Sequence, residues 1–137
     1  VYKRQEDGEV LGKHNGLFNY TIGQRKGLGI AYKHPLYVIG FNGERNEVIV
    51  GPNDRLFTNR MICKFYNFLD DTIHKELKAE GKIRYAANPS PCTARILDDD
   101  TMEVIFEEPQ RAITPGQSVA FYNGTQLLGG AVIDRVC

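Results

Sequence analysis

The chain has 137 residues, with 17 basic and 17 acidic residues and therefore no net charge at neutral pH. A hydrophobic fraction of 42% beside 25% charged residues indicates a folded protein of one domain or two small ones. Zero net charge excludes a polycation, so any anion-binding site must be local. No apolar run approaches the roughly 20 residues of a membrane-spanning helix, and the polar start is no signal peptide. Because the chain does not begin with Met, we expect a piece of a longer protein.

The first third contains a glycine-rich basic segment at residues 14–30, "HNGLFNYTIGQRKGLGI". Arg25 and Lys26 are adjacent, and no acidic residue lies between residues 12 and 42. The glycine spacing matches neither a P-loop nor a dinucleotide fingerprint. Two interpretations stay open, a tight connection with solvated charges or an anion-holding loop. In the second, backbone N–H groups and Arg25 hold a phosphate, and the Gln24 amide meets a base edge or a backbone oxygen. We expect this loop to be mobile, because it offers little apolar surface.

Residues 36–51 predict the first hairpin. Two runs rich in β-branched residues, "LYVIGF" and "NEVIVG", flank Asn42-Gly43, and Asn-Gly readily supplies the positive φ angles of a tight turn. Before this hairpin the chain is predicted to be loop-like. Turn residues cluster directly after it, so we place a domain boundary there and predict domains at 1–57 and 58–137.

The second half is predicted to consist of short strands at regular spacing. "KELKAEGKIRY" is predicted to be mostly strand, since Gly81 interrupts its helical start. "TARILD" and "TMEVIFEE" form a predicted hairpin around Asp99-Asp100, and residues 118–134 form another around Asn123-Gly124. This pattern favours a small β-barrel or sandwich.

Three polar residues of the second half are candidates for binding. Arg84 and Tyr85 are neighbours on a predicted strand, so their side chains leave opposite faces, and Arg84 is free to meet phosphate while Tyr85 packs or stacks. Pro115-Gly116 predicts a turn that presents Gln117 at the start of the next strand. The alternatives are an ordinary surface arginine beside a core tyrosine, and a glutamine bonded to its own backbone.

The cysteines and acidic residues do not predict a catalytic or metal site. Cys63, Cys92 and Cys137 show no CxxC spacing, and their number is odd, which fits a reducing cytoplasm and argues against disulfides or structural zinc. Cys92 is expected to be a buried small hydrophobe, because nothing beside it in the sequence would lower its pKa. The run at 98–100 lacks the glycine and the terminal glutamate of a calcium loop, and three scattered histidines make no metal motif.

Four stretches in order carry a family resemblance: "GKHNGLFNYTIGQRKGLGI", "LYVIGFNGERNEVIVG", "KIRYAANPSPCTARI" and "VIFEEPQRAITPGQSVAFYNGTQLLGGAVI". Together they resemble the C-terminal half of the bacterial tRNA-specific 2-thiouridylases, the MnmA/TrmU family formerly labelled tRNA methyltransferases. The resemblance covers residues from about 8 to 134.

The resemblance implies a mainly β fold with a small β-rich central domain followed by a six-stranded antiparallel β-barrel, which together hold the tRNA anticodon stem-loop. It implies that an N-terminal ATP-pyrophosphatase domain of the parent binds ATP and adenylates the C2 oxygen of the wobble uridine (U34). A cysteine persulfide, supplied through a sulfur-carrier protein, then delivers sulfur. This chain would hold neither the ATP site nor the catalytic cysteines, and no cofactor of its own. The parent would be cytoplasmic, with no membrane contact.

Carried over by motif, the RNA-binding residues implied by the resemblance are Arg84, Tyr85 and Gln117 in the barrel, and Gln24, Arg25 and Lys26 in the glycine-rich loop. Two other functions stay open. One is a translation-factor-like β-barrel that docks a protein or a folded RNA without modifying it. The other is a free-standing thiol enzyme that uses Cys92.

Overall fold

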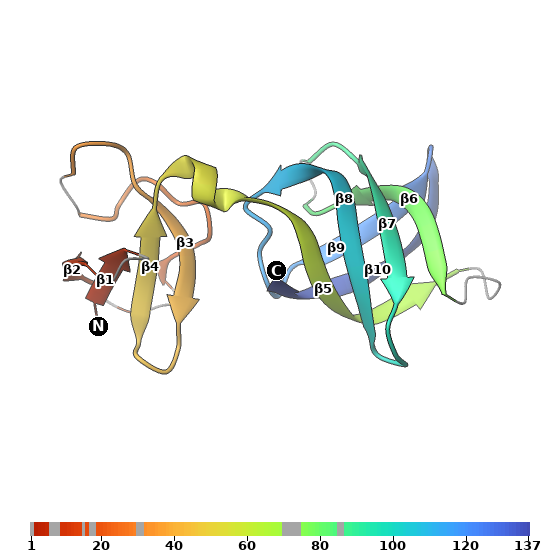
Figure 1. Ribbon diagram of the computed structural model, residues 1–137, viewed down its shortest axis with the longest axis horizontal. Coiled ribbons are helices and arrows are strands. Elements are labelled where there is room, and N and C mark those ends of the chain that lie inside the picture. Colours follow the sequence, from red (N-terminus) through yellow and green to blue (C-terminus); the bar gives the residue numbers. More distant parts are fainter. Residues whose placement is uncertain are drawn as a thin grey trace. The chain divides into compact units, whose positions relative to one another are not determined.

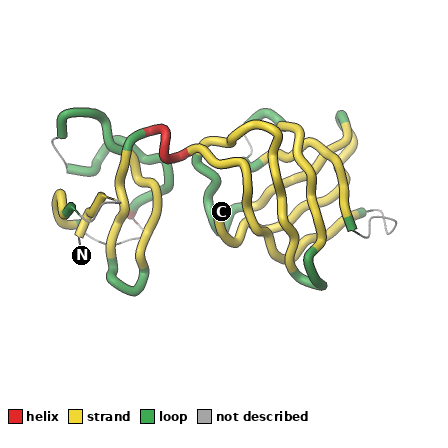
Figure 2. The backbone as a smooth tube through the Cα atoms, in the orientation of Figure 1, coloured by secondary structure: helices red, strands yellow, loops and turns green. Residues whose placement is uncertain are grey.

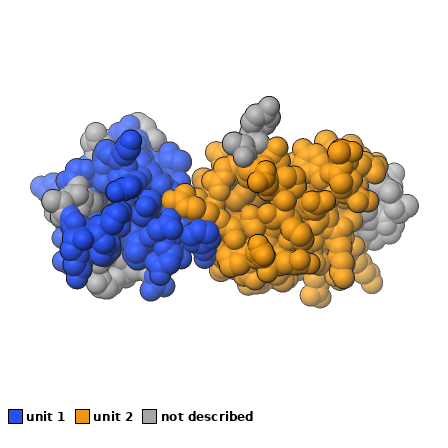
Figure 3. All heavy atoms as spheres, turned by 90° about the horizontal axis from the view of Figure 1, so that it is seen from above, with its two compact units in different colours: residues 1–57 blue, residues 58–137 orange. Residues whose placement is uncertain are grey.

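A computed structural model describes residues 2–5, 9–14, 16, 19–29, 32–69, 75–84 and 87–137 of the chain. Strands and their connections make up almost all of this part, and a short 3-10 helix, η2 (Asn53–Leu56), follows the fourth strand (Figures 1 and 2). The chain separates into two compact units, Val1–Phe57 and Thr58–Cys137 (Figure 3). No helix in the described part is long and apolar enough to cross a membrane.

Unit 1 contains a four-stranded sheet in the order β2-β1-β4-β3. Its strands are β1 (Tyr2–Gln5), β2 (Val10–Lys13), β3 (Tyr37–Asn42) and β4 (Glu47–Gly51). β1 runs antiparallel to β2 and parallel to β4, with Lys3 opposite Val48. A small core of buried aliphatic side chains packs on this sheet, formed by Leu28, Leu36, Val38, Val48 and Val50.

The prediction that the chain is loop-like before residue 36 is wrong for β1 and β2. Each has only four residues, "YKRQ" and "VLGK", and neither shows a clear alternation of apolar and polar residues. The pairing of β1 with β4 joins residues about 45 positions apart in the sequence, as with Lys3 and Val48. A local sequence pattern cannot predict such a pairing, because the paired residues are distant in the sequence.

The hairpin predicted at 36–51 is present, but the reason given for its turn is wrong. Asn42 pairs with Glu47, so four residues connect the strands, and the left-handed residue is Asn46 (φ 55°) rather than Gly43. The N–H of Arg45 donates to Oδ1 of Asn42 (3.3 Å). At the second Asn-Gly, by contrast, Asn123 pairs with Gln126 across a two-residue turn, and Gly124 has φ 61°.

Unit 2 is a closed barrel with the strand order β10-β5-β8-β7-β6-β9. Its strands are β5 (Phe57–Phe68), β6 (Glu76–Lys82), β7 (Ser90–Ile96), β8 (Thr101–Arg111), β9 (Ser118–Asn123) and β10 (Gln126–Val136). The predicted fold class is confirmed, including the six-stranded antiparallel barrel, and the predicted strand at "KELKAEGK" is β6. β7 and β8 form the hairpin predicted around Asp99-Asp100.

The barrel interior is filled by alternate residues of its strands. On β7, Cys92 and Ala94 are buried, whereas Arg95 is exposed. The largest buried side chains are Phe106 and Phe121, at 1% and 0% exposure. The remainder of this core comprises Met61, Cys63, Ile83, Met102, Val104, Ile113, Val119, Ala131 and Ile133.

We predict that Phe106→Ala lowers the free energy of unfolding by about 3–5 kcal/mol, because it removes a large side chain from a closed core and leaves a cavity. Phe65→Ala is the matched control, since Phe65 is 70% exposed on β5. It should change the free energy by less than about 0.5 kcal/mol. Urea unfolding monitored by circular dichroism measures both, and equal losses for the two variants would contradict this description of the core.

Candidate nucleic-acid interface

The glycine-rich loop of unit 1 is held in shape by its own glutamine. The N–H of Thr21 donates to Oε1 of Gln24 (3.0 Å), and Nε2 of Gln24 donates to the carbonyl of Lys26 (2.9 Å). The backbone of the same residue pairs with β3, because the N–H of Val38 donates to the Gln24 carbonyl (2.9 Å). The side-chain amide of Gln24 therefore fixes the backbone that carries Arg25 and Lys26, whose side chains are both exposed.

Leu28 anchors the end of this loop in the core of unit 1. It is 4% exposed, and the glycines on either side have left-handed φ angles, 78° at Gly27 and 66° at Gly29. Such angles are costly for other residues, so the two glycines allow the chain to turn inward and out again around one leucine. The premise that the loop lacks apolar surface to fix it is therefore wrong at Leu28.

A buried lysine supports the same turn from beneath. Lys3 on β1 is 6% exposed, and its Nζ donates to the carbonyl of Leu28. The same Nζ lies 5.6 Å from the centre of the Tyr20 ring. A buried ammonium is tolerated only where it has partners, and here a carbonyl and an aromatic face supply them.

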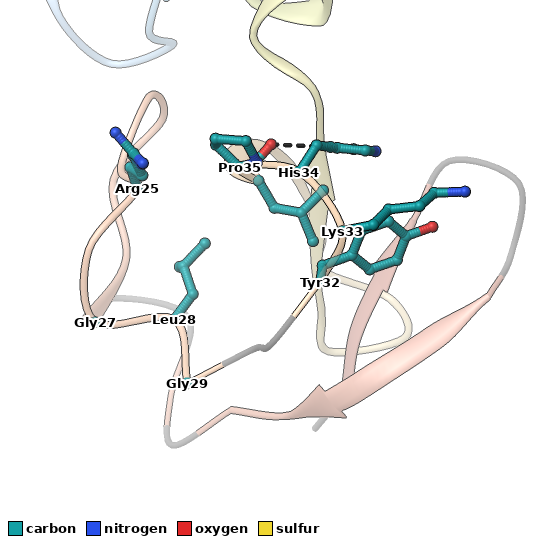
Figure 4. Close-up of a pocket in the computed structure, with 9 residues that line it drawn as sticks. Arg25, Gly27, Leu28, Gly29, Tyr32, Lys33, His34 and Pro35 are labelled. Atoms are coloured by element: carbon teal, nitrogen blue, oxygen red, sulfur yellow. Dashed lines mark hydrogen bonds between the residues drawn. The ribbon is translucent and has the colours of Figure 1, made fainter.

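Beside the loop is a cavity of about 740 Å³, lined by Arg25, Gly27, Leu28, Gly29, Tyr32, Lys33, His34, Pro35 and Leu36 (Figure 4). The side chains of Tyr32, Lys33 and His34 extend in the same direction, which in Figure 4 is away from Arg25. The Tyr32 and His34 rings meet edge to face at 4.9 Å, and Lys33 Nζ lies 5.9 Å from the Tyr32 ring centre.

In the barrel, the connection from β8 to β9 gathers the other candidate residues. Nη2 of Arg84 donates to the carbonyl of Arg111, the last residue of β8. Ala112 then takes a left-handed φ of 57°, and Oγ1 of Thr114 donates to its carbonyl (2.9 Å). This connection therefore bends sharply and is bonded to the Arg84 guanidinium.

Gln117 ends the same connection. Its N–H donates to the carbonyl of Thr114 (3.2 Å), and its carbonyl accepts from the N–H of Ile133 (2.8 Å). The backbone of Gln117 is thus fixed on both sides while the residue stays exposed. The connection 111–117 links Arg84 and Gln117, which are 33 positions apart in the sequence.

Acidic groups gather at the opposite end of the barrel. β8 runs from Thr101 beside the acidic turn to Arg111, so the two lie ten residue steps apart, or about 30 Å. In that turn the Asp98 carboxylate accepts from the N–H groups of Asp100 and Thr101, each at 2.9 Å. These hydrogen bonds, first the one from Asp100, lower the pKa of Asp98 and keep it ionised. The acidic turn therefore lies at the other end of β8 from the carbonyl that the Arg84 guanidinium contacts.

Among the six residues predicted to bind RNA, the structure groups Gln24, Arg25 and Lys26 in one loop of unit 1, whereas in unit 2 Arg84 contacts the first residue of the connection 111–117 and Gln117 is its last. Tyr85 lies outside the described residues. The sequence reasoning missed Arg111 and the run Tyr32-Lys33-His34. An adjacent aromatic and basic run after the glycines was the signal available for the second of these.

The cysteines do not form a reactive site. Cys63 and Cys92 are buried and free, as expected for Cys92, and Cys137 is exposed. Burial raises the pKa of Cys63 and of Cys92 to about 12, so both thiols stay protonated at neutral pH. The hypothesis of a thiol enzyme that uses Cys92 is therefore not supported. Over the described ranges, no group of three or more His, Cys, Asp or Glu residues is arranged to hold a metal ion.

Comparison with known proteins matches each unit to a family model. Residues 58–133 match the model described as "Aminomethyltransferase beta-barrel domain", and residues 2–52 match the "tRNA methyl transferase PRC-barrel domain". The chain therefore belongs to the family of tRNA-modifying proteins that these domains define, in which its curated relatives carry the name tRNA-specific 2-thiouridylase.

Two of these relatives show the extent of the similarity. The "tRNA-specific 2-thiouridylase MnmA" of Clostridioides difficile is 46% identical over 129 residues, which is 93% of this chain and 36% of the relative. The protein of the same name from Carboxydothermus hydrogenoformans is 47% identical over 130 residues, which is 94% of this chain and 36% of that relative. The chain thus spans about a third of the length of the relatives it matches.

We predict that Lys3→Met destabilises the glycine-rich loop, because it leaves the buried carbonyl of Leu28 without its ammonium donor. The expected loss is about 1–3 kcal/mol, seen as faster amide hydrogen exchange at residues 27–29. Lys13→Met on the exposed position of β2 is the matched control and should leave this exchange unchanged. Unchanged exchange in both variants would show that Lys3 does not hold the loop.

We predict that iodoacetamide modifies Cys137 quickly at pH 8 and leaves Cys63 and Cys92 almost unmodified in the folded protein. With a pKa of about 12, only about one thiol in 10,000 is a thiolate at that pH. Below this pKa, the thiolate fraction of each buried cysteine should rise about tenfold for each unit by which the pH is increased. Mass spectrometry of the labelled peptides measures the three rates, and Cys137→Ser should remove the fast phase. Rapid labelling of native Cys92 would restore the thiol hypothesis.

Proposed function

We propose that this chain is the tRNA-holding portion of a tRNA 2-thiouridylase. In this proposal the two units are the domains 1–57 and 58–137, and both contact the anticodon stem-loop. Arg84, Tyr85 and Gln117 bind RNA from the barrel, and Arg25 and Lys26 do so from the glycine-rich loop, where Gln24 contributes to RNA binding by positioning them. The main support is the charge arrangement of the barrel, in which Arg84 and the acidic turn lie at opposite ends.

A protein with zero net charge can hold RNA when its cations are local and fixed. Phosphate contacts provide most of the affinity for nucleic acids, and each neutralised phosphate releases counterions. The bond from Arg84 to the Arg111 carbonyl uses one arm of the guanidinium. Because a guanidinium has five N–H donors, the remaining ones can still reach a phosphate. This bond to the backbone therefore orients the Arg84 guanidinium and leaves N–H donors for a phosphate.

The residues of the two loops have two different roles: some position the backbone and others contact the RNA. Gln24 is a positioning residue, because both ends of its amide are bonded within the loop. Arg25 and Lys26 are exposed and provide charge to the phosphates. Gln117 offers an exposed amide on a fixed backbone, which suits a hydrogen bond to a base edge or a ribose.

The chemistry would be done by other parts of the parent protein. We propose that an N-terminal ATP-pyrophosphatase domain binds ATP and activates U34 at C2, and that a cysteine persulfide fed by a sulfur-carrier protein supplies the sulfur. The parent would work in the cytoplasm. The contribution of this chain is to hold the stem-loop still, so that one nucleotide is presented to that site.

We predict that the chain binds unmodified tRNA in a salt-dependent way, and that Arg84→Ala and Arg25→Ala each weaken the binding. Each lost phosphate contact should reduce the slope of log affinity against log salt by about 0.7–0.9. Fluorescence anisotropy with a labelled anticodon stem-loop, measured over a series of salt concentrations, gives these slopes.

Arg95→Ala is the matched control for this experiment. Arg95 is also an exposed barrel arginine, but it stands on β7 between Glu76 and Glu103 of the neighbouring strands. The Arg95→Ala substitution should leave both the affinity for the stem-loop and the slope of log affinity against log salt unchanged. Binding that is indifferent to salt, and equal in all three variants, would contradict the proposed function.

A further inference from the structure

We infer that the cavity beside the glycine-rich loop binds one unstacked nucleotide of a single-stranded RNA segment, with the exposed His34 ring stacking on the base, Tyr32 supporting that ring, and Lys33 and Arg25 meeting the phosphates. This inference rests on the proposed function and deepens it, since it names a nucleotide subsite and three residues, Tyr32, Lys33 and His34, that the motifs did not assign.

The aromatic side of the cavity is built for a flat ligand. The Tyr32 and His34 rings meet edge to face at 4.9 Å, and the Nδ1 of His34 lies 3.1 Å from the carbonyl oxygen of Pro35, which fixes the imidazole (Figure 4). Tyr32 also packs against the core of unit 1, whereas His34 is exposed. Tyr32 therefore supports the His34 ring from its edge, and the exposed imidazole gives a base a surface on which to stack.

The charges of the cavity suit a phosphodiester. Arg25 and Lys33 both line the cavity, although their side chains extend away from each other, and no acidic side chain is among the nine lining residues (Figure 4). Lys33 Nζ lies 5.9 Å from the Tyr32 ring centre, where a phosphate flanking a stacked base would pass. The lining of the cavity therefore has two cations and no carboxylate to repel a phosphate.

The base of the cavity combines apolar side chains with exposed backbone. Leu28 and Leu36 are 4% and 5% exposed and form part of the core, whereas Gly27 and Gly29 are exposed. Glycine lets a ligand approach the peptide N–H groups closely. A volume of about 740 Å³ is within the range of about 300–1,000 Å³ that is usual for sites of small ligands.

A tryptophan reporter tests this directly, because the chain contains no Trp. His34→Trp places an indole at the exposed stacking position without disturbing the core, and a stacked base quenches its fluorescence. The probes are a single-stranded oligouridylate of five residues, uridine 5′-monophosphate and inorganic phosphate. Phe65→Trp is the control, since Phe65 is exposed on the barrel and its N–H binds the acidic turn at Asp100 (3.0 Å).

We expect the oligouridylate to quench the indole of the His34→Trp variant and to leave that of the Phe65→Trp variant unchanged, and inorganic phosphate to quench neither. Uridine 5′-monophosphate should quench the His34→Trp reporter only at much higher concentration. Lys33→Ala added to this reporter should weaken oligouridylate binding by about tenfold, while Lys13→Ala leaves it unchanged. Tyr32→Phe, which keeps the ring, should retain the quenching.

The inference is wrong if the wild-type chain binds the anticodon stem-loop while neither that stem-loop nor the oligouridylate quenches the His34→Trp reporter; the proposed function would then survive it. Equal affinity for the mononucleotide and the oligouridylate would overturn the assignment to an RNA strand. Quenching of the reporter by the oligouridylate in a chain that does not bind the stem-loop would support the subsite and contradict the proposed function.

Discussion

Closure of the barrel between β6 and β9 is the constraint on which the candidate interface of unit 2 depends. Glu80, Gly81 and Lys82 pair with Tyr122, Phe121 and Ala120, which leaves neither strand with a free edge. Closure also demands close packing. A Cβ built on Gly81 would lie 3.0 Å from Cε1 of Phe106 and 3.1 Å from Sγ of Cys92. Glycine is therefore the residue that allows β6 to lie over this core, and Arg84 lies two residues beyond the end of β6.

The two units hold their exposed cations by the same physical means. In the barrel, the Arg84 guanidinium binds a backbone carbonyl at the end of β8. In unit 1, the Gln24 amide and the buried Lys3 ammonium bind the carbonyls of Lys26 and Leu28. Each bond satisfies a backbone oxygen in a connection that a sheet ladder does not reach. Local anchoring of this kind gives a neutral chain positive surfaces of fixed geometry, without the self-repulsion of a polycation.

The sequence predicted those parts of the fold that local patterns determine. Alternation and turn residues were sufficient for β3, β4 and the strands from β6 to β10, and the closed six-stranded form followed from the family motifs. The sequence patterns did not predict β1 and β2, because the pairing of β1 with β4 is non-local. The turn predicted at Asn42-Gly43 was wrong in its length. The same dipeptide forms a two-residue turn at Asn123-Gly124, but after Asn42 four residues connect the strands. The motifs also indicated the two loops proposed to bind RNA, but not how these loops are held. No spacing shows that Lys3 lies under Leu28, or that Arg84 reaches Arg111, since folding alone brings these residues together.

The central claim is that RNA meets this chain at the glycine-rich loop, its adjacent cavity and the β8–β9 connection, and avoids the acidic end of the barrel. Amide chemical-shift mapping of the isotope-labelled chain with an unlabelled anticodon stem-loop tests it most directly. The account predicts that the shifts gather at residues 23–29, 32–36 and 111–117, while residues 97–101 stay unchanged. Shifts that centre on the acidic turn and spare both loops would contradict it.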